Sequence, residues 1–108
     1  VTHGVVVNLL DQKLDNLNPD FFSYTLSKAA LLAATKTMAM AFASRLRVNG
    51  VSPGATLQSW EQSPEGFVEA NHIALLGRSS RPADIVQAVL YLVDAPAVTG
   101  ETVWSDAW

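Results

Sequence analysis

Tyr24 and Lys28 are the residues whose types and spacing most directly suggest chemistry. They lie four positions apart in a stretch expected to be helical, so their side chains share one face, about 6 Å apart along the axis. A nearby ammonium stabilises a phenolate and can lower a tyrosine pKa from about 10 by about 1–3 units. Such a tyrosine can give or take a proton at neutral pH. The same spacing is also typical of an exposed tyrosine packed on a lysine stem.

Asp11 is the third candidate, thirteen residues before Tyr24. It follows an apolar run, residues 4–10, that is typical of a strand buried on both faces in a parallel sheet. Open α/β sheets bind ligands at the carboxyl ends of their strands. Asp11 is therefore a candidate partner of Tyr24 and Lys28. The plainer alternative is a solvated carboxylate at the start of a loop.

The elements that must position these side chains follow the order β-α-β-α-β. The long helix, 21–47, contains no Gly or Pro and is apolar all round, so we expect it to be covered on more than one side. A shorter helix begins after Ser63-Pro64. The remaining predicted elements are strands 4–10, 45–52 and 101–105, and a helix over 82–92. This pattern predicts an α/β fold with about three parallel strands, in one domain over residues 1–108.

Composition narrows the function classes. The 108 residues include no cysteine, which excludes disulfides and thiolate metal sites. Net charge is −3 with 7 Lys+Arg, which argues against nucleic-acid and anionic-membrane surfaces. His3 and His72 are distant in sequence, so no metal site is predicted. With 49% hydrophobic residues and no initiator Met, the chain is expected to be a piece of something larger or to bury surface against a partner.

The ordered set of motifs resembles the C-terminal half of a short-chain dehydrogenase/reductase. The matching pieces are Tyr-x-x-x-Lys at Tyr24 and Lys28, residues 49–54 (Asn-Gly-Val-Ser-Pro-Gly), Arg81-Pro82 and Thr99-Gly100. Most members of that family carry serine thirteen residues before the tyrosine. Asp11 stands there in this chain, as in the pteridine reductases, which the sequence therefore resembles further.

The resemblance implies half of a Rossmann-type doubly wound sheet and hydride transfer from NADP(H) to a C=N or C=O bond, with a pterin as a candidate substrate. Tyr24 would be the proton donor or acceptor. Lys28 would lower its pKa and hold the nicotinamide ribose, and Asp11 would assist proton delivery or orient the substrate. Residues 57–76 would form the variable substrate lid. The contacts to the nicotinamide end of the cofactor would come from Pro53, Gly54 and Thr56.

The resemblance further implies a cytoplasmic protein with a small-molecule substrate, associating with copies of itself through helix 21–47. Two departures stand against activity of the chain alone. No G-x-G-x-x-G phosphate loop is present, so we expect weak NADPH binding by this chain. The family's usual Val-Asp-Gly-Gly is replaced by Trp-Ser-Asp-Ala-Trp over residues 104–108. The alternative is a non-catalytic αβ module that self-associates or completes another chain of the family.

Two further patterns are weaker. Residues 50–54 match the G-x-S-x-G nucleophile elbow, with Ser52 as nucleophile. That elbow needs the N–H of the next residue, and Pro53 has none. Three tryptophans could stack on a pterin ring, although Trp104 is expected in the core and Trp108 at an interface; the third is Trp60.

Overall fold

The structure is a computed structural model that describes residues 3–15, 17, 19–54 and 80–105. Its strands and helices follow the predicted β-α-β-α-β order. The first strand is followed by two short 3₁₀ turns, Gln12–Asp15 and Pro19–Phe21. The other elements are β1 (Gly4–Leu9), α1 (Phe22–Ala41), β2 (Leu46–Pro53), α3 (Pro82–Asp94) and β3 (Thr102–Ser105). The helix expected after Ser63-Pro64 lies outside the described residues.

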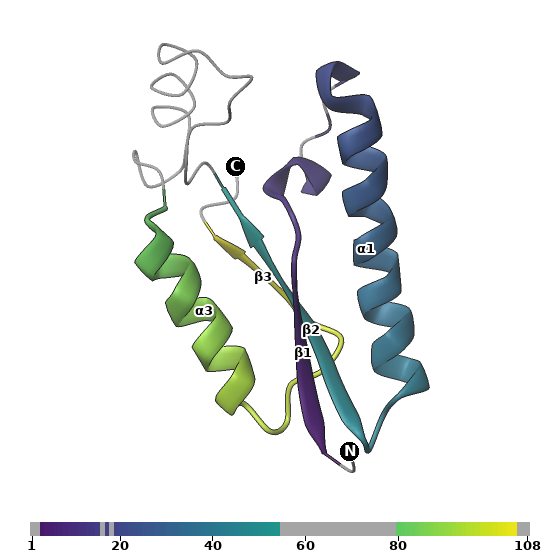
Figure 1. Ribbon diagram of the computed structural model, residues 1–108, viewed down its shortest axis with the longest axis vertical. Coiled ribbons are helices and arrows are strands. Elements are labelled where there is room, and N and C mark those ends of the chain that lie inside the picture. Colours follow the sequence, from purple (N-terminus) through teal and green to yellow (C-terminus); the bar gives the residue numbers. More distant parts are fainter. Residues whose placement is uncertain (1–2, 16, 18, 55–79, 106–108) are drawn as a thin grey trace.

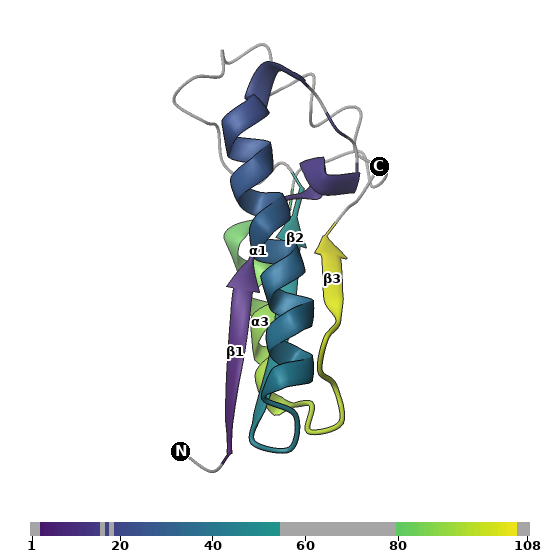
Figure 2. The same cartoon turned by 90° about the vertical axis from the view of Figure 1, so that its right-hand side faces the viewer.

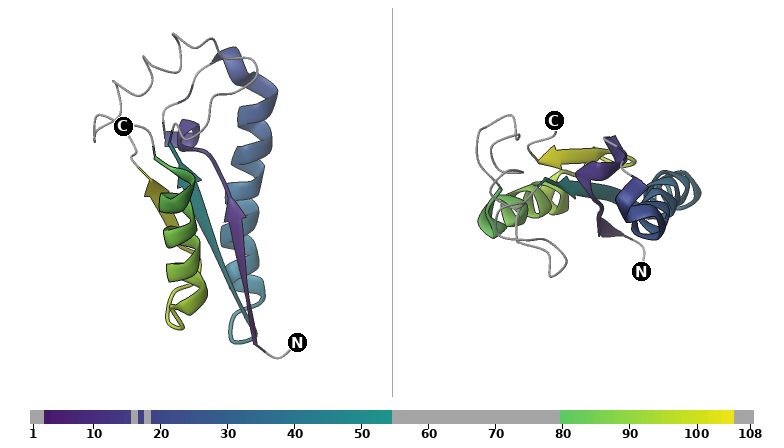
Figure 3. Two further views of the ribbon diagram at one scale, coloured as in Figure 1. Left: turned by 60° about the vertical axis from the view of Figure 1, so that its left-hand side comes forward. Right: turned by 90° about the horizontal axis from the view of Figure 1, so that it is seen from above.

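The three strands form one parallel sheet in the order β1-β2-β3. Gly4 pairs with Leu46 and Leu9 with Val51, while Gly50 pairs with Thr102 and Pro53 with Ser105. The two helices cover opposite faces of the sheet, with α1 on one side and α3 on the other (Figures 1 and 3). All three strands point the same way, so their carboxyl ends meet at one edge (Figure 2).

The centre of the core is β2. Val48 and Val51 are fully buried in it, because this strand has a neighbour on each side and a helix on each face. β1 pairs only with β2 and is one of the two edge strands of the described sheet. Val6 is 37% exposed and Leu9 51%. The prediction that the first strand is buried on both faces was therefore wrong, because the helices cover this outer strand less completely than they cover β2.

The long helix is shorter than predicted: α1 ends at Ala41 and not at residue 47. The chain turns over residues 42–45, where Ser44 adopts a left-handed backbone with φ of 72°. The N–H groups of Arg45 and Leu46 both donate to the Phe42 carbonyl, which directs the chain into β2. Glycine is the usual residue in this conformation, so a serine there carries no sequence signal for the helix end.

A buried hydrogen-bond pair fixes α1 against β1. The Asn8 amide nitrogen donates to the Thr35 hydroxyl over 2.9 Å, and that hydroxyl donates to the Leu31 carbonyl over 2.7 Å. Thr35 is fully buried, so removing its hydroxyl would take away the acceptor of the half-buried Asn8 amide. This contact sets how α1, with its reactive side chains, lies over the sheet.

Arg47, in β2, binds the C-terminal end of α3. Its guanidinium donates three hydrogen bonds of 2.7 Å to carbonyls at the end of that helix, those of Leu92, Val93 and Ala95. Helix C-termini leave carbonyls without intrahelical partners, and a cation there also interacts favourably with the helix dipole. Arg47 thus attaches the last turn of α3 to the central strand.

Replacing Arg47 by alanine is expected to lower the free energy of unfolding by about 2–3 kcal/mol, because hydrogen bonds to a charged group are lost and the carbonyls stay partly buried. Urea denaturation, monitored by tryptophan fluorescence, measures the difference in the free energy of unfolding between the variant and the parent. Arg45→Ala removes an exposed arginine two residues away and should change stability by less than about 0.5 kcal/mol. Equal stability of the two variants would contradict the role given to Arg47.

Candidate active site

The three candidate catalytic residues meet at the carboxyl edge of the sheet. Asp11 follows the end of β1, and Tyr24 and Lys28 lie in the first two turns of α1, which starts above the same edge (Figure 1). The 3₁₀ turn after Asp11 is closed by the Leu14 N–H, which donates to the Asp11 carbonyl. The sequence order therefore brings a carboxylate, a phenol and an ammonium together.

The phenol and the carboxylate are in direct contact. The Tyr24 hydroxyl donates to Oδ2 of Asp11 over 2.6 Å. The Lys28 ammonium lies 5.8 Å from the centre of the Tyr24 ring and donates to the Leu9 carbonyl over 2.9 Å. The Ser27 hydroxyl donates to the Tyr24 carbonyl, which is one turn back along the helix. Lys28 thus ties the helix to the end of β1 beside the phenol.

The electrostatics of Tyr24 differ from the expectation. Burial raises the pKa of its phenol above the ordinary value, and both the hydrogen bond to Asp11 and the charge of that carboxylate raise it further. The predicted lowering by Lys28 was wrong for this arrangement. The hydroxyl contacts a carboxylate, while the ammonium is directed to a backbone carbonyl.

This geometry holds the proton on the Tyr24 oxygen at neutral pH. The side chain remains 41% exposed, so a ligand at the carboxyl edge can approach it. A protonated phenol that a carboxylate orients is equipped to donate a proton to a developing anion. The arrangement therefore keeps Tyr24 in the protonated form that a proton donor needs, although the raised pKa makes the phenol a weaker acid.

Two of the predicted cofactor residues, Pro53 and Gly54, lie at the end of the neighbouring strand. Pro53 ends β2, and the Gly54 N–H donates to the Ser105 carbonyl over 2.9 Å. The Leu10 N–H donates to the Val51 carbonyl over 2.7 Å, which continues the β1–β2 pairing up to Asp11. The ends of β1 and β2 are thus held side by side. The predicted residues outside the described part are Thr56, Trp60, His72, Trp108 and the segment 57–76.

Sequence reasoning missed the Leu9 carbonyl, which is the hydrogen-bond partner of Lys28. It also missed the Asn8–Thr35 pair that orients α1. A backbone acceptor has no residue type that marks it. The polar Asn8 inside an apolar strand was the one available signal, because a buried amide needs a partner.

The weaker alternatives find little support in the geometry. Ser52 is fully buried within β2 and does not stand on a turn between a strand and a helix, as a nucleophile elbow would. Trp104 is half-buried in β3.

Among the described residues, no three His, Cys, Asp or Glu side chains cluster as metal ligands. The described helices include none that is long and apolar enough to cross a membrane.

The donors at this edge fit the nicotinamide half of a dinucleotide. An ammonium carries three N–H bonds, and the structure directs one of them to Leu9, so the others can bind ribose hydroxyls. The Tyr24 ring lies beside it on the same helix face. Lys28 would hold the nicotinamide ribose, and Pro53 and Gly54 would border the nicotinamide end from β2.

Comparison with known proteins gives a consistent assignment. The family model described as enoyl-(acyl carrier protein) reductase matches residues 2–107. Two solved structures of FolM alternative dihydrofolate reductase 1, both with NADP, are similar to the chain. The Brucella canis protein is 43% identical with a TM-score of 0.89, covering 95% of this chain and 41% of its own. The Brucella suis protein is 42% identical with a TM-score of 0.92, and the match covers 98% of this chain and 43% of that protein.

A curated relative from Bacillus subtilis (strain 168), the short-chain dehydrogenase/reductase homolog YusR, is 31% identical over 85 residues. That match covers 78% of this chain and 66% of the relative. The chain thus spans about two fifths of each FolM structure and just under two thirds of YusR.

Replacing Asp11 by asparagine is expected to lower the pKa of Tyr24 toward about 10, because a charge that opposes the phenolate is removed. Phenolate absorbance during an alkaline titration measures it. Tyr91→Phe provides a background in which Tyr24 is the only tyrosine.

The raised pKa of Tyr24 also makes the free energy of unfolding depend on pH. The folded pKa lies above the unfolded one, so the stabilisation by Tyr24 is complete below about pH 10 and is lost as the pH rises beyond it. If the Tyr24 titration in Asp11→Asn matches that of the parent, the Asp11 carboxylate does not raise the pKa of Tyr24.

Proposed function

The chain belongs to the short-chain dehydrogenase/reductase family, and we propose that it supplies the proton-transfer side of an NADPH-dependent reductase site for a C=N or C=O bond, with a pterin as substrate. The observation that carries this proposal is the Tyr24–Asp11 hydrogen bond beside Lys28 at the carboxyl edge of the sheet. A protonated phenol and a neighbouring ammonium are the groups that reduction of a polar double bond needs.

Two observations support a pterin. A carboxylate stands where most of the family has serine, and it contacts the catalytic phenol directly. A pterin carries N–H and amino groups, which a carboxylate binds as an acceptor. The similar solved proteins, 42–43% identical, are described as alternative dihydrofolate reductases in complex with NADP. Dihydrofolate contains a pterin ring with a C=N bond.

The reduction adds a hydride to the carbon and a proton to the nitrogen or oxygen of the double bond. When bound, NADPH supplies the hydride. Tyr24 gives the proton from its hydroxyl oxygen, and Asp11 orients that hydroxyl until the substrate takes its place as acceptor. Lys28 holds ribose hydroxyls and offsets the negative charge left on the phenol. The expectation that this chain alone binds NADPH weakly stays a prediction.

Replacing Tyr24 by phenylalanine is expected to lower the turnover of a dihydropterin with NADPH by a factor of about 10²–10⁴, because the proton donor is lost. Loss of NADPH absorbance measures it in the active protein, whether that is this chain alone or this chain within a longer one. NADPH affinity and circular dichroism should stay close to those of the parent. The matched control is Tyr91→Phe in α3, and undiminished turnover in Tyr24→Phe would reject the assignment.

Self-association is a second proposal, which one face of α1 supports. Apolar side chains on this face are exposed, with Phe22 at 69%, Leu26 at 55% and Met40 at 81%. Spacings of four residues and then fourteen keep these positions within one narrow stripe of a helix. The expectation that the long helix is covered on more than one side does not hold within the described chain. A second copy packed on α1 would bury this stripe.

Leu26→Glu is expected to shift the chain toward monomer in sedimentation velocity experiments, because it places a charge in the proposed contact. Val86→Glu is the matched control, since Val86 has nearly the same exposure on the other helix, 54%. The proposal fails if both variants sediment like the parent chain, or if the parent is a monomer at every concentration.

A further inference from the structure

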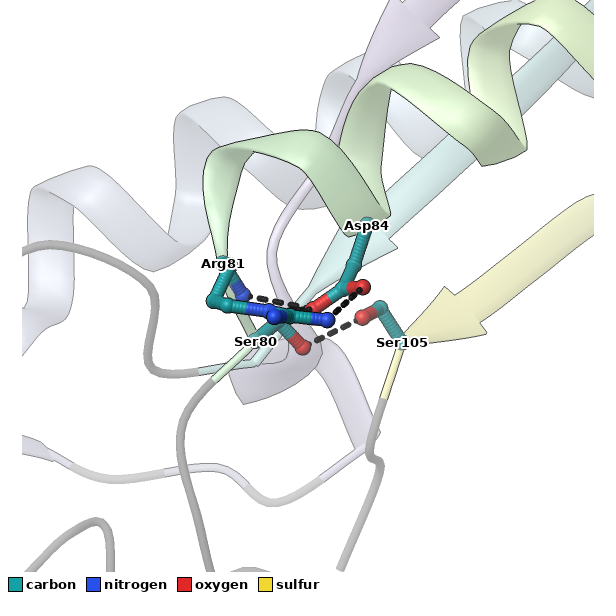
Figure 4. Close-up of polar contacts among 4 residues, drawn as sticks. All are labelled: Ser80, Arg81, Asp84 and Ser105. Carbon is teal, nitrogen blue, oxygen red and sulfur yellow. Dashed lines mark hydrogen bonds and ion pairs between the residues drawn. The ribbon is translucent and has the colours of Figure 1, made fainter.

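Ser105, the last residue of β3, hydrogen-bonds to two parts of the chain that lie far apart in sequence. Its carbonyl accepts the Gly54 N–H over 2.9 Å. Its hydroxyl lies 2.5 Å from the hydroxyl of Ser80, and either can be the donor (Figure 4). Gly54 and Ser80 are the two described residues that flank positions 55–79. One residue therefore joins the exit of β2 to the approach to α3.

The Ser80 contact also fixes the start of α3, because Ser80 directly precedes that helix. The next residue, Arg81, caps the helix, and its N–H donates to the Asp84 carboxylate over 2.8 Å. The Arg81 guanidinium also forms an ion pair with that carboxylate (Figure 4). The Asp84 N–H donates to the Arg81 carbonyl, which completes the first turn. The start of α3 is thus internally braced, and the Ser80 hydroxyl is its link to the sheet.

The hydroxyl pair is a specific contact, because Ser80 is only 5% exposed. A buried hydroxyl without a partner is costly, so each serine depends on the other. Nothing about serine in a strand makes such a contact necessary, since an apolar residue would fit a half-buried strand end at least as well.

We propose that Ser105 is a positioning residue that holds Pro53 and Gly54 against the start of α3 and thereby sets the cofactor side of the site. The proposal rests on the proposed function, which places the nicotinamide end of NADPH beside Pro53 and Gly54. Ser105 itself is not a catalytic residue, because it acts through the backbone of Gly54. Its hydroxyl keeps the end of β3, and with it the carbonyl that Gly54 contacts, in place.

The test compares Ser105→Thr with Ser105→Val, which have the same shape and differ only in the hydroxyl. We expect the Gly54 amide to exchange with solvent about tenfold faster in the valine variant, a difference of ~1.4 kcal/mol. The threonine variant should stay near the parent. The Gly100 amide, which donates to the Val48 carbonyl at the other end of the sheet, is the internal control and should not change.

A second measurement follows the Gly54 amide signal by NMR during titration with NADPH, which detects weak as well as tight binding. The valine variant should bind about tenfold more weakly than the threonine variant. Ser80→Ala should weaken binding as Ser105→Ala does, and the double variant should be no worse than either single one, because all three lose the same contact.

The outcomes separate the two proposals. Equal Gly54 exchange in the threonine and valine variants overturns the positioning role. Faster exchange with unchanged NADPH affinity also overturns it, since the hydroxyl would then serve stability alone. If no variant, nor the parent, responds to NADPH, the proposed function fails for this chain, and the Gly54 exchange decides whether Ser105 positions this strand end.

Discussion

The pairing of β2 with a parallel strand on each side is the constraint on which the site depends. Because the three strands run the same way, Asp11, Gly54 and Ser105 all come to one edge of the sheet. The register decides which residues meet there. A shift of one position in the β1–β2 pairing would turn the side chains of β1 to the other face and separate Asn8 from Thr35, and α1 would lose its orientation.

The contact between Tyr24 and Asp11 shows how two demands on one phenol are balanced. A carboxylate at hydrogen-bond distance orients the hydroxyl and keeps it protonated, but opposes the negative charge that remains after proton transfer. The Lys28 ammonium lies near the ring and can offset that charge. Proton donation at this site therefore depends on all three groups, and a ligand that displaces the carboxylate would change the balance most.

Much of this architecture could be predicted because it is local in the sequence. The apolar runs and the uninterrupted helical stretch predict the order of strands and helices, and helical spacing places Tyr24 beside Lys28. The end of α1 could not be predicted, since it depends on a left-handed serine at Ser44. The direction of the Tyr24 pKa was also missed, because it depends on which acceptor each polar group finds in three dimensions. For Lys28 that acceptor is a backbone carbonyl.

The attachments of α3 have a mechanical consequence. Arg47, near the start of β2, binds the last carbonyls of the helix, while the Ser80–Ser105 contact fastens its first turn to the other end of the sheet. A helix of 13 residues is about 20 Å long, so the two attachments lie almost the full length of β2 apart. Axial sliding of α3 would have to break both at once. The two attachments therefore hold α3 in one axial register along β2, so that the two ends of the sheet keep a fixed position relative to the helix.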